Sequence, residues 1–192
     1  MDAGVKAAKA QLRERVRQEL KKLTEPARAG YSAQACALLK QQPEWQKAGS
    51  VLFFAPLPGE LDIWPLLGEA LAAGKEVSLP RFDAAAQKYV ACAVREPQKQ
   101  LRTGQFGIRE PDVTCGLMSL MQLDFILVPG IAFDLQGRRL GRGKGFYDQL
   151  LAAVRGTTCG VAFEQQIVHA VPVEPHDIHL NCILTPTRWV RL

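Results

Sequence analysis

The chain has 192 residues, of which 47% are hydrophobic and 22% are charged, and its formal net charge is +5. These values are close to globular averages and exclude an intrinsically disordered protein, and the length predicts a single domain spanning residues 1–192. The positive charge favours an anionic partner, which could be nucleic acid, an anionic membrane surface, or a phosphorylated or carboxylated small molecule.

The cysteines and the apolar segments indicate the compartment. Five cysteines are scattered along the chain without a Cys-x-x-Cys pair, which argues against a disulfide framework or a zinc site and is typical of a reducing compartment. The first residues lead into a charged helix rather than a signal peptide, and the longest apolar runs, 51–55 and 125–133, are too short to span a bilayer. We therefore expect a cytoplasmic protein without a membrane partner.

Residues 5–23 have the spacing of an amphipathic helix, with apolar residues at every fourth position: Ala8, Leu12, Val16 and Leu20. Lys9 and Arg13 lie one position further round, so they would form a basic stripe beside the buried one. The alternative for these two residues is an ordinary solvated helix face. A second helix is predicted to begin after Ser32, whose hydroxyl is suited to an N-cap.

The pattern changes at residues 50–55, a short and nearly continuous apolar run that is typical of a buried parallel strand. A helix over 62–73 follows, and a second strand over 76–79 is predicted to end at Pro80. Residues 96–122 carry few signals and are expected to be rich in loops. Further strands are predicted at 88–95, 124–128, 158–163 and 182–185.

Strands that alternate with helices predict an α/β fold, with a single-domain, layered, mostly parallel sheet and helices on both faces. In such folds ligands bind at the carboxyl ends of the strands. Glu60 follows the exit turn of the first strand, so it is a candidate ligand contact. The alternative is a solvated loop glutamate, which is the commoner role of an acidic residue.

The most informative segment is 137–148, where three glycines alternate with other residues before a predicted helix: Gly141, Gly143 and Gly145. Glycines at alternate positions let the backbone turn its amides towards one bound anion. The spacing differs from the P-loop, which has four residues between its glycines and a Ser or Thr after its lysine, and from the dinucleotide fingerprint. A basic surface turn is the alternative interpretation.

Charged side chains in the same segment favour the phosphate interpretation. Arg142 and Lys144 lie between the glycines, and a helix beginning near Phe146 would add its N-terminal amides. Asp148, in the first turn of that helix, is close enough to hold a metal ion bound to the same phosphates. The segment therefore predicts a phosphate–magnesium site.

Two further segments have less specific patterns. His176 and His179 have a spacing that can bind zinc from one helical face, but no third ligand has suitable spacing. Asp177 between them is better suited to magnesium, which prefers carboxylates. Phe106, an aromatic residue among glycines, either packs within its loop or offers a stacking surface for a flat ring.

The segment 141–148, Gly-Arg-Gly-Lys-Gly-Phe-Tyr-Asp, is the main part of a resemblance that covers nearly the whole chain. The run Asp-Phe-Ile-Leu-Val-Pro-Gly at 124–130 precedes it. Shorter agreements are Lys9-x-x-Leu-Arg13, Gly107-Ile108 before Glu110-Pro111, and Ala162-Phe-x-x-Gln-Ile167. In this order the segments resemble the 5-formyltetrahydrofolate cyclo-ligase family, also called methenyltetrahydrofolate synthetase.

The resemblance implies an enzyme that uses ATP and magnesium to cyclise 5-formyltetrahydrofolate to 5,10-methenyltetrahydrofolate, by way of phosphorylation of the formyl oxygen. It implies catalytic roles for Arg142 and Lys144, and magnesium ligation by Asp148 and Asp177. The residues implied to contact the folate are Ala55, Glu60, Phe106, Arg142 and Phe146. Those implied to contact ATP are Lys9, Arg13, Arg139, Leu140, Gly141, Arg142, Gly143, Lys144, Gly145, Phe146 and Tyr147.

We expect the partners to be these two small molecules, with neither nucleic acid nor a membrane, and we expect a monomer. Two other functions remain open at this point. The first is another phosphate- or nucleotide-using enzyme on the same fold, since a fold does not determine a function. The second is a basic RNA-binding module, which the net charge favours but for which the sequence has no recognisable motif.

Overall fold

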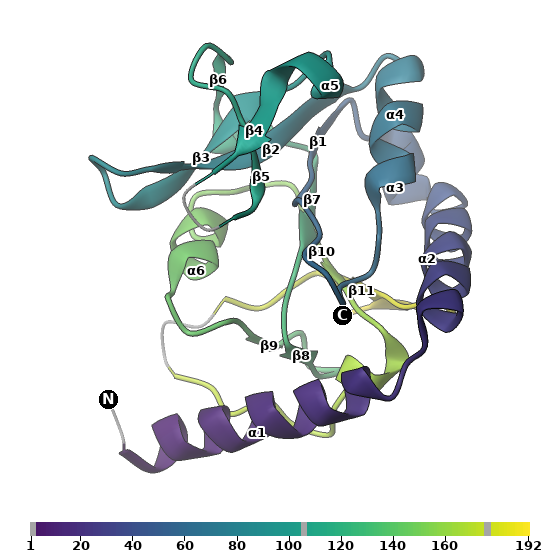
Figure 1. Ribbon diagram of the computed structural model, residues 1–192, viewed down its shortest axis with the longest axis vertical. Helices are drawn as coiled ribbons and strands as arrows, with labels where there is room; N and C mark the ends of the chain where they lie inside the picture. The colour runs from purple at the N-terminus through teal and green to yellow at the C-terminus, as the bar shows by residue number, and fades with distance from the viewer. Residues whose placement is uncertain (1–2, 105–106, 175–177) are drawn as a thin grey trace.

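The computed structural model describes residues 3–104, 107–174 and 178–192. The main element within these residues is a sheet of eight strands (Figure 1). In spatial order the strands are β12 (Trp189–Arg191), β11 (Cys182–Leu184), β10 (Thr157–Val161), β7 (Phe125–Val128), β1 (Ser50–Leu52), β2 (Glu76–Asp83), β3 (Lys88–Ala93) and β6 (Leu117–Met118).

The centre of the sheet is parallel and its two margins are antiparallel. The strands β11, β10, β7, β1 and β2 form a continuous parallel block. β12 pairs antiparallel with β11 at one margin, and β3 pairs antiparallel with both β2 and β6 at the other. The prediction of a mostly parallel α/β sheet is therefore confirmed.

Helices cover both faces of this sheet, as predicted (Figure 1). α2 (Glu25–Lys40), α3 (Pro43–Lys47) and α4 (Trp64–Ala72) pack on one face, and α6 (Phe146–Leu151) packs on the other. The long helix α1 (Ala3–Lys21) lies against the antiparallel pair β8 (Ala132–Phe133) and β9 (Arg139–Leu140). Leu12 and Val16 of α1 are buried there with Leu140 of β9.

β7 is apolar throughout and β1 is apolar after Ser50, because both faces of these strands are buried. Val51 belongs to the core cluster beneath α2, α3 and α4, whereas the next residue, Leu52, belongs to the cluster beneath α6. Phe125 and Ile126 of β7 divide between the clusters in the same way. Since alternate residues of a strand point to opposite faces, a central strand covered on both sides favours apolar side chains on both faces. The buried Ser50 of β1 is the exception, and its hydroxyl donates a hydrogen bond to the carbonyl oxygen of Gln122 at 3.1 Å.

The predicted start of the second helix was wrong. α2 begins at Glu25, and its N-cap is Thr24, whose hydroxyl oxygen accepts a hydrogen bond from the Ala27 amide at 3.4 Å. Ser32 lies inside the helix and is buried, where its hydroxyl oxygen accepts a hydrogen bond from the amide of Asp62 at 3.0 Å. Ser32 therefore joins α2 to the segment before α4 rather than capping a helix.

The predicted end of the second strand was also wrong, because β2 continues through Pro80 to Asp83. The carbonyl of Ser78 accepts a hydrogen bond from the amide of Phe53, just beyond the end of β1. Alternate residues present their backbone polar groups on the same side, so the nitrogen of Pro80 faces the side on which β1 has already ended. A proline there loses no hydrogen bond of the ladder.

Residues 96–122 contain only short elements: α5 (Pro97–Gln100), β4 (Leu101–Thr103), β5 (Arg109–Pro111), β6 and the 3₁₀ helix η1 (Leu120–Gln122). β4 and β5 pair antiparallel in a separate two-stranded sheet, which the sequence did not indicate. A second 3₁₀ helix, η2 (Glu164–Gln166), follows β10. No helix in the described part of the chain has the length and apolar character needed to cross a membrane.

Candidate functional site

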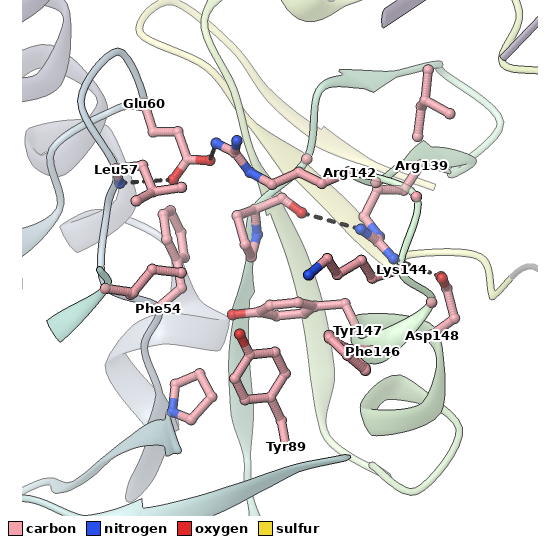
Figure 2. A pocket seen from close by; sticks show the side chains of 18 of the residues that line it. Phe54, Leu57, Glu60, Tyr89, Arg139, Arg142, Lys144, Phe146, Tyr147 and Asp148 are labelled. Carbon is pink, nitrogen blue, oxygen red and sulfur yellow. Dashed lines mark hydrogen bonds and ion pairs between the residues drawn. The ribbon is translucent and has the colours of Figure 1, made fainter. Parts of the chain in front are cut away.

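A cavity of about 750 Å³ lies at the carboxyl ends of the central strands (Figure 2). Phe54 and Ala55 line it just after β1, Pro80 lines it from β2, and Pro129 and Gly130 line it just after β7. Parallel strands end at the same edge of a sheet, so the connections that follow them surround one space. The cavity is therefore where an α/β fold is expected to bind its ligand.

The glycine-rich loop that connects β9 to α6 forms one wall of this cavity. Gly143 has a φ of +102° and Gly145, the N-cap of α6, has a φ of +69°, a region of backbone conformation that favours glycine. A Cβ on Gly141 would lie 2.8 Å from the Arg139 guanidinium. The backbone conformation at Gly143 and Gly145 and the close approach of Arg139 at Gly141 therefore favour glycine. Together the three glycines allow the loop to turn tightly beside the cavity.

Helix α1 brings basic side chains to this loop. The Nε of Arg13 donates a hydrogen bond to the carbonyl oxygen of Gly141 at 2.9 Å. Burial, together with repulsion from Arg17, lowers the pKa of Arg13 below its ordinary value. An anion bound next to Arg13 would be stabilised, because these surroundings disfavour an isolated positive charge.

Three cations of the cavity are paired with carboxylates: Arg142 with Glu60, Arg139 with Asp148, and Lys9 with Glu174, at N–O distances of 2.7, 2.5 and 2.8 Å. Glu60 also accepts a hydrogen bond from the Leu57 amide at 3.0 Å, so its carboxylate is held from two sides (Figure 2). Among the described residues, seven basic and four acidic side chains line the cavity. The excess positive charge favours a polyanionic ligand.

Aromatic rings form a further part of the wall (Figure 2). The ring of Tyr89 lies 5.7 Å from that of Phe146 and 5.9 Å from that of Tyr147, measured between centroids. Burial raises the pKa of the Tyr147 phenol, so this ring stays neutral. Rings in such an arrangement offer an apolar surface on which a flat heterocycle can pack.

Glu110 of β5 is a buried acid that lines the cavity. One carboxyl oxygen accepts a hydrogen bond from the Phe82 amide at 3.1 Å, and the other has no partner among the described residues. Burial is the largest influence on this group, and it raises the pKa of Glu110 above its ordinary value of 4.5. The folded protein therefore favours the protonated form of this side chain more than the unfolded chain does.

A pH dependence of stability follows from Glu110. Because its pKa is higher in the folded state, the folded state binds more protons, and this contribution to stability is full below pH 4.5 and lost as pH rises through the folded pKa. We expect Glu110→Gln to gain stability relative to the unaltered protein as pH rises through the folded pKa of Glu110, because glutamine stays neutral. Urea unfolding of both proteins at a series of pH values from below 4.5 upwards measures the difference in stability. If the stabilities of the two proteins changed in parallel with pH, the raised pKa of Glu110 would be contradicted.

The carboxylate near the start of α6 that could hold magnesium is that of Asp148. One oxygen of Asp148 accepts a hydrogen bond from Arg139, and its side chain is about a quarter exposed, at 27%. No group of three His, Cys, Asp or Glu side chains suited to a metal occurs within 3–104, 107–174 and 178–192. Magnesium needs only one or two carboxylates when phosphate oxygens and waters complete its coordination, so the carboxylate of Asp148 beside the glycine-rich loop is chemically suited to this ion.

The residues predicted to contact ligands come together in the structure. All fourteen of those that the structure describes line the one cavity: Lys9, Arg13, Ala55, Glu60, Arg139, Leu140, Gly141, Arg142, Gly143, Lys144, Gly145, Phe146, Tyr147 and Asp148. Phe106 and Asp177 lie outside the described residues. The individual contacts of these residues with ATP, folate and magnesium stay predictions.

Sequence reasoning did not single out several residues that line the cavity. Tyr89 lies in a strand whose alternating pattern gave no sign of a ligand, and Glu174 lies in an irregular segment. Leu57 contributes a backbone amide, which no side-chain pattern reveals. Glu110 did have a signal, because it belongs, like Ile108, to the short segment 107–111 that contributes to the family resemblance.

Comparisons with known proteins identify the family. A family model described as the 5-formyltetrahydrofolate cyclo-ligase family matches residues 5–186. The chain belongs to this family. The 5-formyltetrahydrofolate cyclo-ligase of Escherichia coli (strain K12) is 32% identical over 177 residues, which cover 90% of this chain and 97% of that protein. The Mus musculus enzyme of the same name is 29% identical over 191 residues, which cover 94% of each chain.

A solved structure supports membership of the cyclo-ligase family. The NMR structure of Aquifex aeolicus 5,10-methenyltetrahydrofolate synthetase has a TM-score of 0.86 and 38% sequence identity to this chain, covering 96% of this chain and 92% of that one. The family match includes both α1 and the glycine-rich loop. The cavity is thus built from the part of the chain that cyclo-ligases share, and the predicted resemblance is confirmed.

Proposed function

We propose that the protein catalyses the ATP- and magnesium-dependent cyclisation of 5-formyltetrahydrofolate to 5,10-methenyltetrahydrofolate, with release of ADP and phosphate. The observation that most supports this is the ion pair between Arg142 of the glycine-rich loop and Glu60, which follows β1. This pair joins the part of the cavity suited to phosphates to the part suited to a folate ring. Family membership makes this reaction the first choice among phosphate-using enzymes.

The reaction must overcome a poor leaving group, because the oxygen of a formamide does not depart unaided. When the γ-phosphoryl group of ATP is transferred to the formyl oxygen, the formyl group becomes a phosphate ester. Its oxygen can then leave as phosphate. N10 then attacks the formyl carbon, the C–O bond breaks, phosphate leaves with the bonding electrons, and N10 loses its proton. The protein has to align the formyl oxygen with the γ-phosphorus and stabilise the charge on the transferring group.

Phosphate binding is proposed for the glycine-rich loop and for α1. Arg142 and Lys144 would stabilise the oxygens of the transferring group, and Lys9 and Arg13 would hold the remaining phosphates. Asp148, together with Asp177, would hold magnesium. When bound, this ion neutralises phosphate charge and holds the phosphate chain in one geometry.

Folate binding is proposed for the opposite part of the cavity. Phe146 would pack against the flat ring, next to Tyr89, which lies 5.7 Å from it. Glu60 would accept hydrogen bonds from ring N–H donors while Arg142 holds its carboxylate. Ala55 and Phe106 complete the proposed folate contacts.

The proposal includes a monomer that acts in the cytoplasm and binds two small molecules, without nucleic acid or a membrane. Five buried free cysteines agree with a reducing compartment. The basic residues that line the cavity surround a concave site rather than forming a flat basic surface, which favours a small polyanion over an RNA strand.

The deciding experiment is turnover with defined components. Protein, 5-formyltetrahydrofolate and magnesium-ATP are mixed, and the near-ultraviolet absorbance of the methenyl product is followed together with release of phosphate. We expect one phosphate per product, and no product when ATP, magnesium or the formyl group is omitted. Phosphate release that does not depend on the folate would instead indicate another phosphate-using enzyme and would contradict the proposal.

A further inference from the structure

Glu174 forms an ion pair with Lys9, the lysine of α1 for which a phosphate contact is proposed. Its carboxylate lies 2.8 Å from the Nζ of Lys9, and both residues line the cavity. The two residues are 165 positions apart in the chain, so the contact depends on the tertiary fold. In the same segment, the amide of Val171 donates a hydrogen bond at 2.8 Å to the buried carboxylate of Asp134.

This pair is far less exposed than a typical surface pair. The side chains of Lys9 and Glu174 are 13% and 16% exposed, whereas those of Lys40 and Glu69, which pair at 2.9 Å, are 45% and 52% exposed. Charges screened little by solvent interact strongly, and an opposite charge within contact distance is costly to remove. A phosphate group that approaches Lys9 must therefore compete with a carboxylate already in place.

We propose that Glu174 occupies the position on Lys9 that a nucleotide phosphate takes, so that the nucleotide binds only by displacing it. This inference rests on the proposed function, in which Lys9 holds a phosphate of ATP. Glu174 would thus be a residue that determines nucleotide affinity by acting through Lys9. It would also disfavour singly charged anions, which gain too little from Lys9 to displace a fixed carboxylate.

The test is a double-mutant cycle on ATP binding, measured by calorimetry with the full chain. If Lys9 is released from Glu174 in about a tenth of the molecules, Glu174→Gln should tighten ATP binding about tenfold, because it removes that competition. Lys9→Met should weaken ATP binding. In the Lys9→Met background, Glu174→Gln should change the dissociation constant less than about twofold, since the residue it acts through is missing.

The control is Glu69→Gln, which removes the same charge from the exposed pair with Lys40 and should leave ATP binding unchanged. Glu174→Ala is measured as a second variant, and thermal unfolding verifies that each protein is folded. Equal tightening by Glu174→Gln with and without Lys9 would indicate general repulsion and overturn the inference. If Lys9→Met binds ATP normally, the proposed contact of Lys9 with a phosphate of ATP is wrong. That outcome is distinct from weaker binding by Lys9→Met without tighter binding by Glu174→Gln, which would overturn only the role of Glu174.

Discussion

Replacing Arg142 or Lys144 by alanine is expected to lower turnover by roughly 10²–10³, the scale of losing one preorganised donor to a transition state. Both side chains lie on the glycine-rich loop and line the cavity. The two variants should differ in one respect, because Arg142 also pairs with Glu60 at 2.7 Å. Arg142→Ala should raise the KM for both ATP and the folate, whereas Lys144→Ala should act mainly through ATP.

Steady-state kinetics with each substrate varied in turn measures these effects. Arg15→Ala and Lys47→Ala are suitable controls, because each removes the same kind of charge from an exposed position that does not line the cavity. Both controls should retain turnover within about twofold, as surface substitutions usually do. Near-normal turnover in both Arg142→Ala and Lys144→Ala would exclude the proposed role of these side chains in stabilising the transferring phosphoryl group.

Replacing Asp148 by alanine is expected to destabilise the folded protein as well as remove the proposed magnesium ligand. The side chain of Arg139 is only 3% exposed, and it pairs with Asp148 at 2.5 Å. Removing the carboxylate leaves a buried guanidinium without its counterion. Because Asp148 itself is 27% exposed, we expect a loss of about 2–3 kcal/mol, below the roughly 3–5 kcal/mol of a fully buried pair.

Urea unfolding without ligands measures this loss separately from catalysis. Glu69→Ala breaks an exposed pair and should cost no more than about 1 kcal/mol. A loss no larger than that of the control would mean that solvent or neighbouring groups compensate Arg139. The double variant Arg139→Met with Asp148→Ala should recover stability, because the unpaired charge is then absent.

The parts of the fold that could be predicted are those whose cause is local in the chain. The strand β1 was predictable because burial on both faces imposes a continuous apolar run, and the glycine-rich loop because two of its glycines have positive φ values. The start of α2 was predicted wrongly because Ser32 and Thr24 are both suitable caps, although Glu25 and Pro26 in the first turn are local signals that favour Thr24. The tertiary contact of Ser32 with Asp62 explains why a serine lies inside the helix.

The residues of the site divide in the same way between local and tertiary causes. Arg142 and Lys144 could be recognised because their neighbours in the chain are glycines. The partners of the site cations could not, since Glu60 and Glu174 are distant in sequence from Arg142 and Lys9 and meet them only after the chain has folded. Tyr89 was missed for the same reason, because its role depends on the position of Phe146.

The passage of β2 through Pro80 has a consequence for what the sheet edge can accept. β1 ends at Leu52 while β2 continues, so one side of β2 has no hydrogen-bonded strand beside the cavity. An exposed strand side of this kind normally invites β-augmentation by a peptide or edge-to-edge aggregation. Here Pro80 has no amide hydrogen and the Phe82 amide is already bonded to Glu110. This side of β2 can therefore border a cavity for a small molecule without pairing with an added strand.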